Sequence, residues 1–295
     1  MLIYILSRHP NSYSTSRLAK VIVSRGHNVR IIDHLQCELR IGRKSHIYYQ
    51  DEELEKPDYI VPRIGASATF KGSNVVRQFE MMKVKTLVTA DGLLSSRDKL
   101  RSSQNLVFHD IEVPKTYFPS SFQTNLRFMA EQVGGLPIII KLIEGTQGIG
   151  VSLAHDFRTA KQVITEHNKF KKKYLIQEFV KESSGQDIRV LVVGGKAVSA
   201  MKRIAPEGEF RSNIHRGGRG EKVILTKAEE YIAIKTAKVM NLSVAGVDIL
   251  QSNKGPLVLE VNSSPGLEGI EKYTGINIAE KIVEFMENSL TSIKN

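Results

Sequence analysis

The chain has 295 residues, a length that suggests about two domains. Its hydrophobic content of 41% and its net charge of +11 fit a globular protein with anionic partners, such as nucleotides or acidic peptides. The sequence holds no apolar run of roughly 18 residues and no signature of a nucleic-acid-binding module, so neither a membrane nor direct nucleic-acid binding is expected. Cys37 is the only cysteine, which excludes internal disulfides and cysteine-cluster zinc sites and favours the reducing cytoplasm.

The first 95 or so residues alternate short apolar runs with amphipathic stretches. The runs predict strands at Ile3–Leu6, Val29–Ile32, Tyr59–Val61 and Leu87–Thr89. Helical periodicity at Ser16–Val23 and Val75–Met82 separates some of these strands. The alternation predicts an α/β layer with a parallel sheet. The apolar start, MLIYILSRHP, lacks the basic leader of a secretory signal and is interpreted as the first strand.

The pattern changes after Asp91-Gly92. A polar helix is predicted at Ser95–Leu106, and strands joined mostly by short turns come after it. These strands are predicted at Ile138–Leu142, Val151–Leu153, Tyr174–Phe179, Asp187–Val193, Ala197–Arg203, Gly246–Leu250 and Leu257–Val261. Helices are predicted at Phe157–His167, Ala228–Met240 and Ile278–Leu290. This part of the chain is therefore expected to be α+β, with largely antiparallel sheets.

The last predicted strand pair carries polar side chains in an apolar setting. Glu260 and Asn262 lie two residues apart, so a strand places both on one face. If the turn between the strands is symmetric about Lys254, Asp248 lies directly opposite Glu260. Opposed carboxylates repel each other unless a cation lies between them, and oxygen ligands of this kind suit Mg²⁺. We predict a divalent-metal site here; the alternative is an exposed sheet face with unrelated polar residues.

A glycine-rich stretch, KLIEGTQGIGV, connects two predicted strands. Lys141 ends the first strand, and Gly145, Gly148 and Gly150 leave the backbone free to present N–H groups to phosphates. The stretch is neither a Walker A loop nor a dinucleotide fingerprint, because it lacks the required residues and the helix that would follow the glycines. We interpret it as a flexible cover over a nucleotide, with a plain glycine-rich hairpin turn as the alternative.

Two further polar stretches contribute candidate ligands. In YLIQEFVKESSGQDIRV, Glu178 is suited to an adenine amino group, and Asp187 is suited to a ribose or a cationic partner. The alternative is a surface pair between Asp187 and Arg189, which share a strand face. The basic stretch FRSNIHRGGRG contains Arg211 and, together with Arg203, predicts an anion site for phosphoryl or carboxylate groups. The alternative there is a solvated basic loop.

Together these stretches resemble the ATP-grasp ligases, and more narrowly the RimK-type family, which attaches glutamate to the C-terminus of the sixth small-subunit ribosomal protein. The similarity is carried by VPRIGASATFKG, RQFEMM, RDKLRS, KLIEGTQGIGV, DIRVLVVGG, FRSNIHRGG, AGVDIL and LEVNSSPGLEGIEK. It implies an N-terminal α/β domain at residues 1–96 and an ATP-grasp domain of two α+β lobes at 97–295. The central lobe would cover about 97–175 and the C-terminal lobe about 176–290. Arg219 departs from the family pattern and bears on acceptor choice.

The resemblance also implies a set of site residues. ATP would be bound by Lys99, Lys141, Gly148, Glu178, Phe179, Val180, Asp187, Arg211, Ser212 and Asn213. Two divalent ions, Mg²⁺ or Mn²⁺, would be bound by Asp248, Glu260 and Asn262. The catalytic set would be Arg203, Arg211 and Asn213, which would stabilise the tetrahedral intermediate.

The activity that the resemblance implies is that of an ATP-dependent carboxylate–amine ligase. Its partners would be ATP, L-glutamate and the acidic C-terminal tail of a small-subunit ribosomal protein, and the protein would form a homo-oligomer. Two alternatives stay open: an ATP-grasp ligase for a small-molecule acceptor in amino-acid or cofactor biosynthesis, and a non-catalytic, nucleotide-regulated ribosome or RNA binder. Fold alone does not choose among them.

Overall fold

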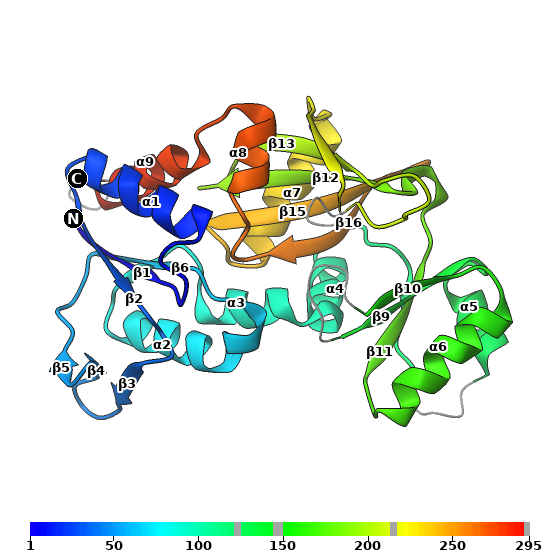
Figure 1. Ribbon diagram of the computed structural model, residues 1–295, viewed down its shortest axis with the longest axis horizontal. Helices are drawn as coiled ribbons and strands as arrows, with labels where there is room; N and C mark the ends of the chain where they lie inside the picture. The colour runs from blue at the N-terminus through cyan, green and yellow to red at the C-terminus, as the bar shows by residue number, and fades with distance from the viewer. Residues whose placement is uncertain (121–124, 144–149, 213–216, 292–295) are drawn as a thin grey trace.

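The computed structural model describes residues 1–120, 125–143, 150–212 and 217–291 (Figure 1). The chain starts with a parallel sheet in the order β2-β1-β6-β7. Its strands are β1 (Leu2–Leu6), β2 (Asn28–Ile32), β6 (Tyr59–Pro62) and β7 (Lys85–Thr86). The predicted parallel sheet is confirmed, but the strand predicted at Leu87–Thr89 is wrong. The ladder ends with β7 because Thr89 already caps α3 (Ala90–Arg97), accepting a hydrogen bond from the N–H of Gly92.

Helices cover both faces of this sheet. Figure 1 shows α1 (Tyr13–Ser24) and α9 (Ile278–Thr291) on one face and α2 (Thr69–Met81) on the other. A short helical turn, η1 (Ala66–Ala68), leads into α2. A small antiparallel sheet of β3 (Cys37–Arg40), β4 (His46–Tyr49) and β5 (Glu52–Glu53) follows β2. The sequence analysis missed this sheet because its strands are too short for a clear alternation of apolar and polar residues.

Two helices stand where one was predicted at Ser95–Leu106. The first, α3, ends at Arg97, and α4 (Lys99–Phe108) begins two residues later. Between them Asp98 has extended backbone, and its carboxylate accepts hydrogen bonds from the N–H groups of Leu100 and Arg101, both at 3.0 Å. This N-cap ends one helix and starts the next, which places Lys99 in the first turn of α4.

The central lobe is built on an antiparallel sheet in the order β10-β9-β11-β8. Its strands are β8 (Thr116–Tyr117), β9 (Ile138–Leu142), β10 (Val151–Ala154) and β11 (Tyr174–Glu178). The helix α6 (Phe157–Lys169) packs on β9 and β10, and α5 (Leu126–Gln132) packs against α6. Ile140 and Ile176 are fully buried in the core between the sheet and these helices.

The C-terminal lobe is a five-stranded antiparallel sheet in the order β14-β13-β12-β15-β16. Its strands are β12 (Gln186–Val193), β13 (Lys196–Ile204), β14 (Arg219–Lys222), β15 (Val244–Ser252) and β16 (Gly255–Asn262). The turn η2 (Lys181–Ser183) precedes β12. Two helices flank the sheet, α7 (Lys227–Val239) and α8 (Glu268–Thr274). The helix α7 begins with a capping box, in which Thr226 and Glu229 bind each other's backbone N–H groups.

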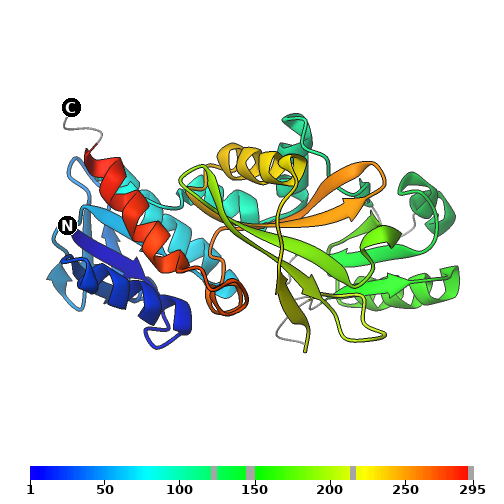
Figure 2. The same cartoon turned by 90° about the horizontal axis from the view of Figure 1, so that it is seen from above.

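The apolar core is divided into two clusters. The larger cluster joins the N-terminal sheet to the C-terminal lobe, and it includes Ile5, Val190 and Met286 of α9. The smaller cluster is confined to the central lobe. Figure 2 shows the central lobe at the end of the molecule opposite α9. Among the described residues, no helix combines the length and the apolar character needed to cross a membrane.

Candidate active site

The last hairpin places Asp248 directly opposite Glu260, as the sequence predicted. Asn262, on the same strand as Glu260, pairs with Gly246. Asp248 is buried at 3% exposure, whereas Glu260 is exposed. The three polar side chains therefore share one face of the sheet, and the face runs from a buried carboxylate to one that solvent reaches.

The pairing depends on a β-bulge that the symmetric hairpin did not include. The turn consists of Asn253 and Lys254, because Ser252 pairs with Gly255. This tight turn alone would place Leu259, rather than Glu260, opposite Asp248. The register shifts between Asp248 and Ile249, so one extra residue enters β16 and Glu260 moves into place. The bulge thus puts both carboxylates on the same face.

Asp248 belongs to a row of alternating charges that crosses the sheet. Arg189 on β12 pairs with Asp248, donating from Nε at 2.7 Å and from Nη2 at 2.6 Å. Arg203 on β13 makes the same forked contact with Asp187, with both hydrogen bonds at 2.6 Å. Nη2 of Arg203 also lies 2.9 Å from Asp248. Burial opposes the charge on Asp248, but the two guanidinium groups hold its pKa below the usual value.

This row decides how two of the predicted residues lie. The surface Asp187–Arg189 pair is not formed, because each residue pairs across the strands with a different partner. Asp187 is 5% exposed, and its Oδ2 also accepts a hydrogen bond from Ser212 at 2.6 Å. Both oxygens of Asp187 are thus engaged within the lobe. Two carboxylates raise the pKa of Arg203 above its usual value despite the burial that opposes its charge.

The two predicted phosphate-binding lysines line one cavity with residues of β16, the second strand of the last hairpin. Lys141 at the end of β9 donates to Oε1 of Gln177 at 2.5 Å, and Lys99 donates to the carbonyl of Ile143 at 3.2 Å. Burial lowers the pKa of Lys141 to about 8, although the charge of Glu260 opposes this shift. Burial also lowers the pKa of Lys99, against the opposing charge of Glu260. Two ammonium groups and one carboxylate therefore meet between the lobes.

A narrow cavity of ≈ 30 Å³ lies at this meeting point. It is lined by residues of α3, α4, β9, β11 and β16, among them Lys99, Lys141, Gln177 and Glu260. A wider, open hollow of ≈ 680 Å³ lies on α6 between Arg158 and Phe170, but it contains none of the predicted ligands. We take the cavity between the lobes as the candidate active site, because Lys99, Lys141 and Glu260 of the predicted ligands line it.

The remaining predicted residues that the structure describes do not line this cavity; they lie at the end of β11 and in the basic segment. Oε2 of Glu178 accepts a hydrogen bond from the N–H of Lys115 at 3.1 Å, and Phe179 and Val180 follow directly. Arg211 pairs with Glu209 at 2.7 Å, and this contact lowers the pKa of Glu209 to about 2. The predicted ligands Gly148 and Asn213 lie outside the described residues. The segment after Arg211 ends in a strand, β14, which the sequence analysis had treated as loop.

Hard-cation ligands are present at the hairpin, and their chemistry fits Mg²⁺. Two carboxylates and one amide share a face, and within the described residues Glu260 makes no ion pair and no side-chain hydrogen bond. No group of three or more His, Cys, Asp and Glu side chains that could hold a metal occurs in the described ranges. Asp248 shares its oxygens with two guanidinium groups, so an ion there must compete with them.

Two residues of the site were not assigned a role from sequence. Gln177 holds Lys141 and also donates to Thr116 at 2.9 Å, and Arg189 holds Asp248. The period of two along β12 did place Arg189 on the face of Asp187. Nothing in the sequence marked Gln177, because its partner lies 36 residues away along the chain.

Comparison with known proteins identifies the family. The model of the RimK-like ATP-grasp domain matches residues 96–286, and that of the RimK pre-ATP-grasp domain matches residues 1–93. The chain is 53% identical to a probable alpha-L-glutamate ligase of Syntrophotalea carbinolica over 288 residues, which are 97% of this chain and 95% of that protein. It is 50% identical to the probable alpha-L-glutamate ligase of Nitrosococcus oceani, over 99% of this chain and 97% of that protein.

Solved structures share the fold at lower sequence identity. The ATP-grasp ligase PsnB, complexed with a phosphomimetic variant of its minimal precursor, Mg and ADP, superposes with a TM-score of 0.73 at 17% identity over 97% of both chains. D-cycloserine synthetase DcsG superposes with a TM-score of 0.71 at 13% identity, over 98% of this chain and 99% of that one. ATP-grasp ligases use ATP as a co-substrate together with Mg²⁺. The chain therefore belongs to the RimK-like ATP-grasp family and is an ATP-dependent ligase with an N-terminal pre-ATP-grasp domain.

Proposed function

We propose that the protein is an alpha-L-glutamate ligase that adds L-glutamate to the C-terminus of the sixth small-subunit ribosomal protein in the cytoplasm. The observation that carries this proposal is the identity of about 50% to probable alpha-L-glutamate ligases over nearly the whole chain. The net charge of +11 supports it, because ATP, glutamate and an acidic tail are all anionic. A homo-oligomer is part of the proposal and rests on the family resemblance alone.

The first step joins ATP to the acceptor. An oxygen of the acceptor carboxylate attacks the γ-phosphorus of ATP, the bond to the β-phosphate oxygen breaks, and ADP leaves with its electrons. An acyl phosphate is formed. Lys99 and Lys141 neutralise charge that builds on the phosphate oxygens, and their position beside the cavity supports this role.

The second step forms the amide bond. The amine of glutamate attacks the acyl carbon, and inorganic phosphate leaves from the tetrahedral intermediate after the amine has lost a proton. The chain needs no nucleophile of its own for this chemistry. In the proposal Arg211 and Asn213 stabilise the developing oxyanion. Arg203 acts with them or, as its two carboxylate contacts suggest, holds Asp187 and Asp248 in place.

Asp248, Glu260 and Asn262 are proposed to hold Mg²⁺ or Mn²⁺, as two ions. Such ions supply positive charge at the phosphate oxygens when they are bound. Arg189 and Arg203 keep Asp248 ionised and oriented, and exposed Glu260 supplies the more accessible ligand. In the ATP-binding role proposed for Asp187, a ribose hydroxyl would donate to Oδ1, which accepts one hydrogen bond from Arg203, whereas Oδ2 accepts from both Arg203 and Ser212.

Mass measurement tests the proposed acceptor. The protein is incubated with ATP, Mg²⁺ and L-glutamate, together with either the purified ribosomal protein or a set of small amino acids and dipeptides. The proposal predicts ribosomal protein heavier by whole glutamyl residues, with ADP released in step. Products on small molecules alone contradict the ribosomal acceptor. If the protein instead binds RNA in a salt-sensitive way and releases no ADP, the proposed ligase activity is contradicted.

A further inference from the structure

Two arginines meet where the N-terminal domain joins the C-terminal lobe, and neither has an acidic partner. Arg63 follows β6 and donates from Nη1 to the carbonyl of Pro265 at 2.8 Å. Arg97, the last residue of α3, donates from Nη2 to the carbonyl of Ile64 at 2.6 Å. Within the described residues, both guanidinium groups bind only uncharged carbonyls. Arg189 and Arg203, by contrast, each grip a carboxylate with two hydrogen bonds.

The surroundings of the two arginines make their lack of a counter-ion costly. Both are partly buried, and Nε of Arg97 is buried with no hydrogen-bond partner in the described part of the chain. Burial, together with the like charge of Arg97, lowers the pKa of Arg63 to about 10. Buried guanidinium groups are normally paired with carboxylates or phosphates, because desolvation penalises an isolated charge. Within the described residues, neither guanidinium group is hydrogen-bonded to a carboxylate, and Glu260 acts on Arg97 only through its charge.

The pair lies at the binding edge of the N-terminal sheet. In the order β2-β1-β6-β7, the chain passes from β1 to β2 on one side and then to β6 on the other. Ligands of open parallel sheets bind beyond the carboxyl ends of the strands at such a switch point. Arg63 directly follows the carboxyl end of β6, and Arg8 lies two residues beyond the end of β1. Arg8 in turn donates to the hydroxyl of Ser67 at 3.0 Å.

The same junction is connected to the hairpin of β15 and β16. The segment after β16 reaches the end of β6, where Ser264 donates to the carbonyl of Pro62 at 3.2 Å and Pro265 accepts from Arg63. The charge of Glu260 acts on Arg97 and favours its charged form. An anion held by the two arginines therefore lies next to the face on which ATP is proposed to react.

We propose that Arg63 and Arg97 bind a carboxylate of the amino-acid or peptide substrate and so orient it toward the phosphate-transfer site. This inference rests on the proposed function, in which every substrate other than ATP carries carboxylates. A guanidinium group suits a carboxylate because its planar fork can donate two hydrogen bonds. Lys99 and Lys141 already face the place proposed for the ATP phosphates, so the second cationic pair is assigned to the other substrate.

Binding and kinetics of Arg63→Gln, Arg97→Gln and Arg63→Lys test the proposal. Calorimetry measures L-glutamate and, separately, an acidic acceptor peptide binding to the full chain with Mg²⁺ and a non-hydrolysable ATP analogue. ADP release then gives the three KM values. We expect the dissociation constant and KM of one carboxylate substrate to rise about 10- to 100-fold in the Gln variants. The affinity for the ATP analogue is unchanged, which also shows that each variant is folded.

The substrate whose affinity falls identifies the source of the carboxylate. A rise for glutamate assigns the pair to the incoming amino acid, and a rise for the peptide assigns it to the acceptor. Arg63→Lys keeps the charge and loses the fork, so its effect is smaller than that of Arg63→Gln. The matched control is Arg77→Gln, an exposed arginine of the same domain that pairs with Asp91, and it leaves all three constants unchanged.

Three results overturn the inference. Unchanged affinities for both carboxylate substrates in the Gln variants remove the site while the proposed function stands. A rise confined to ATP reassigns the arginines to phosphate. A different result separates the two proposals. If the wild-type protein forms no glutamyl product but the variants bind a carboxylate substrate more weakly, the arginine site is upheld and the proposed function is refuted. A wild-type protein that binds neither glutamate nor the acidic peptide refutes both.

Discussion

The two lobes that line the active-site cavity rest on different cores. The C-terminal lobe shares one apolar cluster with the N-terminal domain, in which Ile5 and Val190 belong to the same set. The central lobe has its own smaller cluster around Ile140 and Ile176. Leu106 of α4 packs in the larger cluster, although it lies within the range predicted for the central lobe. The domain bounds given from sequence remain a prediction.

This difference shows which part of the molecule is suited to move. The cavity of ≈ 30 Å³ is far smaller than the roughly 300 Å³ or more of small-molecule pockets, so a nucleotide needs the lobes to separate. Moving the central lobe leaves both cores intact, whereas moving the C-terminal lobe away from the N-terminal domain divides the larger one. We therefore expect the N-terminal domain and the C-terminal lobe, with the acidic hairpin and the arginine pair, to stay together as a fixed body. We expect the central lobe, with Lys141, to be the moving lobe.

The fixed body should carry the largest catalytic effect. Glu260→Ala removes the exposed carboxylate of the proposed metal site, and we expect ADP release to fall by more than about 100-fold, beyond the loss typical of groups that only support metal ligands. Steady-state ADP release with saturating Mg²⁺ measures it. Glu230→Ala, an exposed glutamate on α7 of the same lobe, is the control and retains full activity. Unchanged turnover in Glu260→Ala refutes the metal site.

The separateness of the cores can be tested by opening a cavity in the smaller one. Ile176→Ala deletes a fully buried side chain and should destabilise the central lobe by about 2–5 kcal/mol. Hydrogen exchange should then show lost protection in β9 and β11 while β12 and β15 stay protected. The matched variant Ile249→Ala in the larger cluster should show the opposite pattern. Equal losses in both lobes after Ile176→Ala would mean that the two cores unfold as one.

In the moving lobe we expect an effect of intermediate size, namely a pH dependence of the affinity for ATP. Burial lowers the pKa of Lys141 to about 8, so the ammonium that ATP phosphates require is present below that pH and is lost above it. We expect the affinity for an ATP analogue to fall roughly tenfold per pH unit above about 8. Lys141→Arg should abolish this slope, because arginine stays charged throughout. Lys161→Arg on exposed α6 should keep it.

The lowered pKa of Lys141 affects the stability of the fold in the direction opposite to its effect on ATP affinity: as the pH rises, affinity falls and stability increases. Lysine in the unfolded chain titrates near about 10.4, so between about pH 8 and that value the unfolded state binds more protons than the folded state. Stability from this residue therefore rises with pH over that window. Denaturant unfolding at pH 7.5 and 9.5 should show a larger rise in wild-type protein than in Lys141→Met, in which the partly buried Lys99 still contributes. Parallel pH profiles in the two proteins would contradict the lowered pKa.

The sequence predicted the shared face of the last hairpin because strand alternation is a local property. Glu260 and Asn262 share a face whatever the rest of the fold does. The opposition of Asp248 and Glu260 was also right, but through a compensation: the turn is tighter than a symmetric one, and the bulge beside Leu259 restores the register. A bulge depends on how the strand packs, and alternation alone does not reveal it.

The side-chain partners on neighbouring strands could not be predicted from the sequence. Arg189 pairs with Asp248 only because β12 lies between β13 and β15, and strand order is a tertiary property. For the same reason no role was predicted for Arg63. Its lack of a carboxylate partner can be seen only in the folded chain, where α3 and the segment after β16 meet beside it. The helix α8 was missed because it is short and offers little apolar periodicity.

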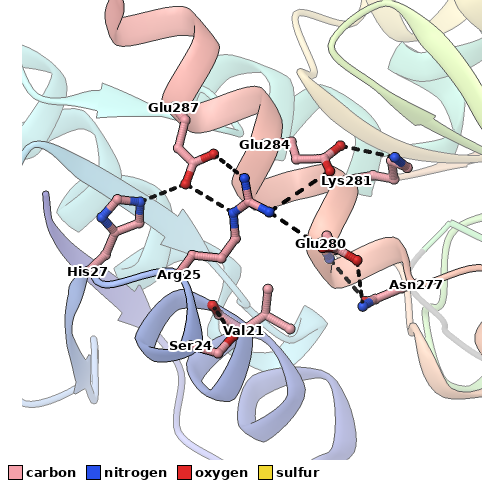
Figure 3. Close-up of polar contacts among 9 residues, drawn as sticks. All are labelled: Val21, Ser24, Arg25, His27, Asn277, Glu280, Lys281, Glu284 and Glu287. Atoms are coloured by element: carbon pink, nitrogen blue, oxygen red, sulfur yellow. Dashed lines mark hydrogen bonds and ion pairs between the residues drawn. The ribbon is translucent and has the colours of Figure 1, made fainter.

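The smallest effect on stability is expected at the ion pairs between α9 and the N-terminal domain, which add to the apolar contacts of the same helix. Figure 3 shows Arg25 and His27 reaching Glu287, with Arg25 also directed at Glu280 and Glu284. Arg25 binds Glu287 at 2.6 Å and 3.0 Å, and His27 lies 2.8 Å from it. The side chain of Glu287 is 26% exposed, so solvent and salt screen these contacts.

Glu287→Gln should therefore lower the free energy of unfolding by at most about 1 kcal/mol, and less in high salt. The hydrogen bond from Arg25 lowers the pKa of Glu287, so its contribution is present above about pH 4.3, the unfolded value, and is lost as the pH falls through the lower folded value. Urea unfolding at pH 7 and pH 3 measures both effects, with exposed Glu207→Gln as the control. A loss of several kcal/mol at pH 7 would show that ion pairs, rather than buried Val283 and Met286, hold α9 to the fixed body.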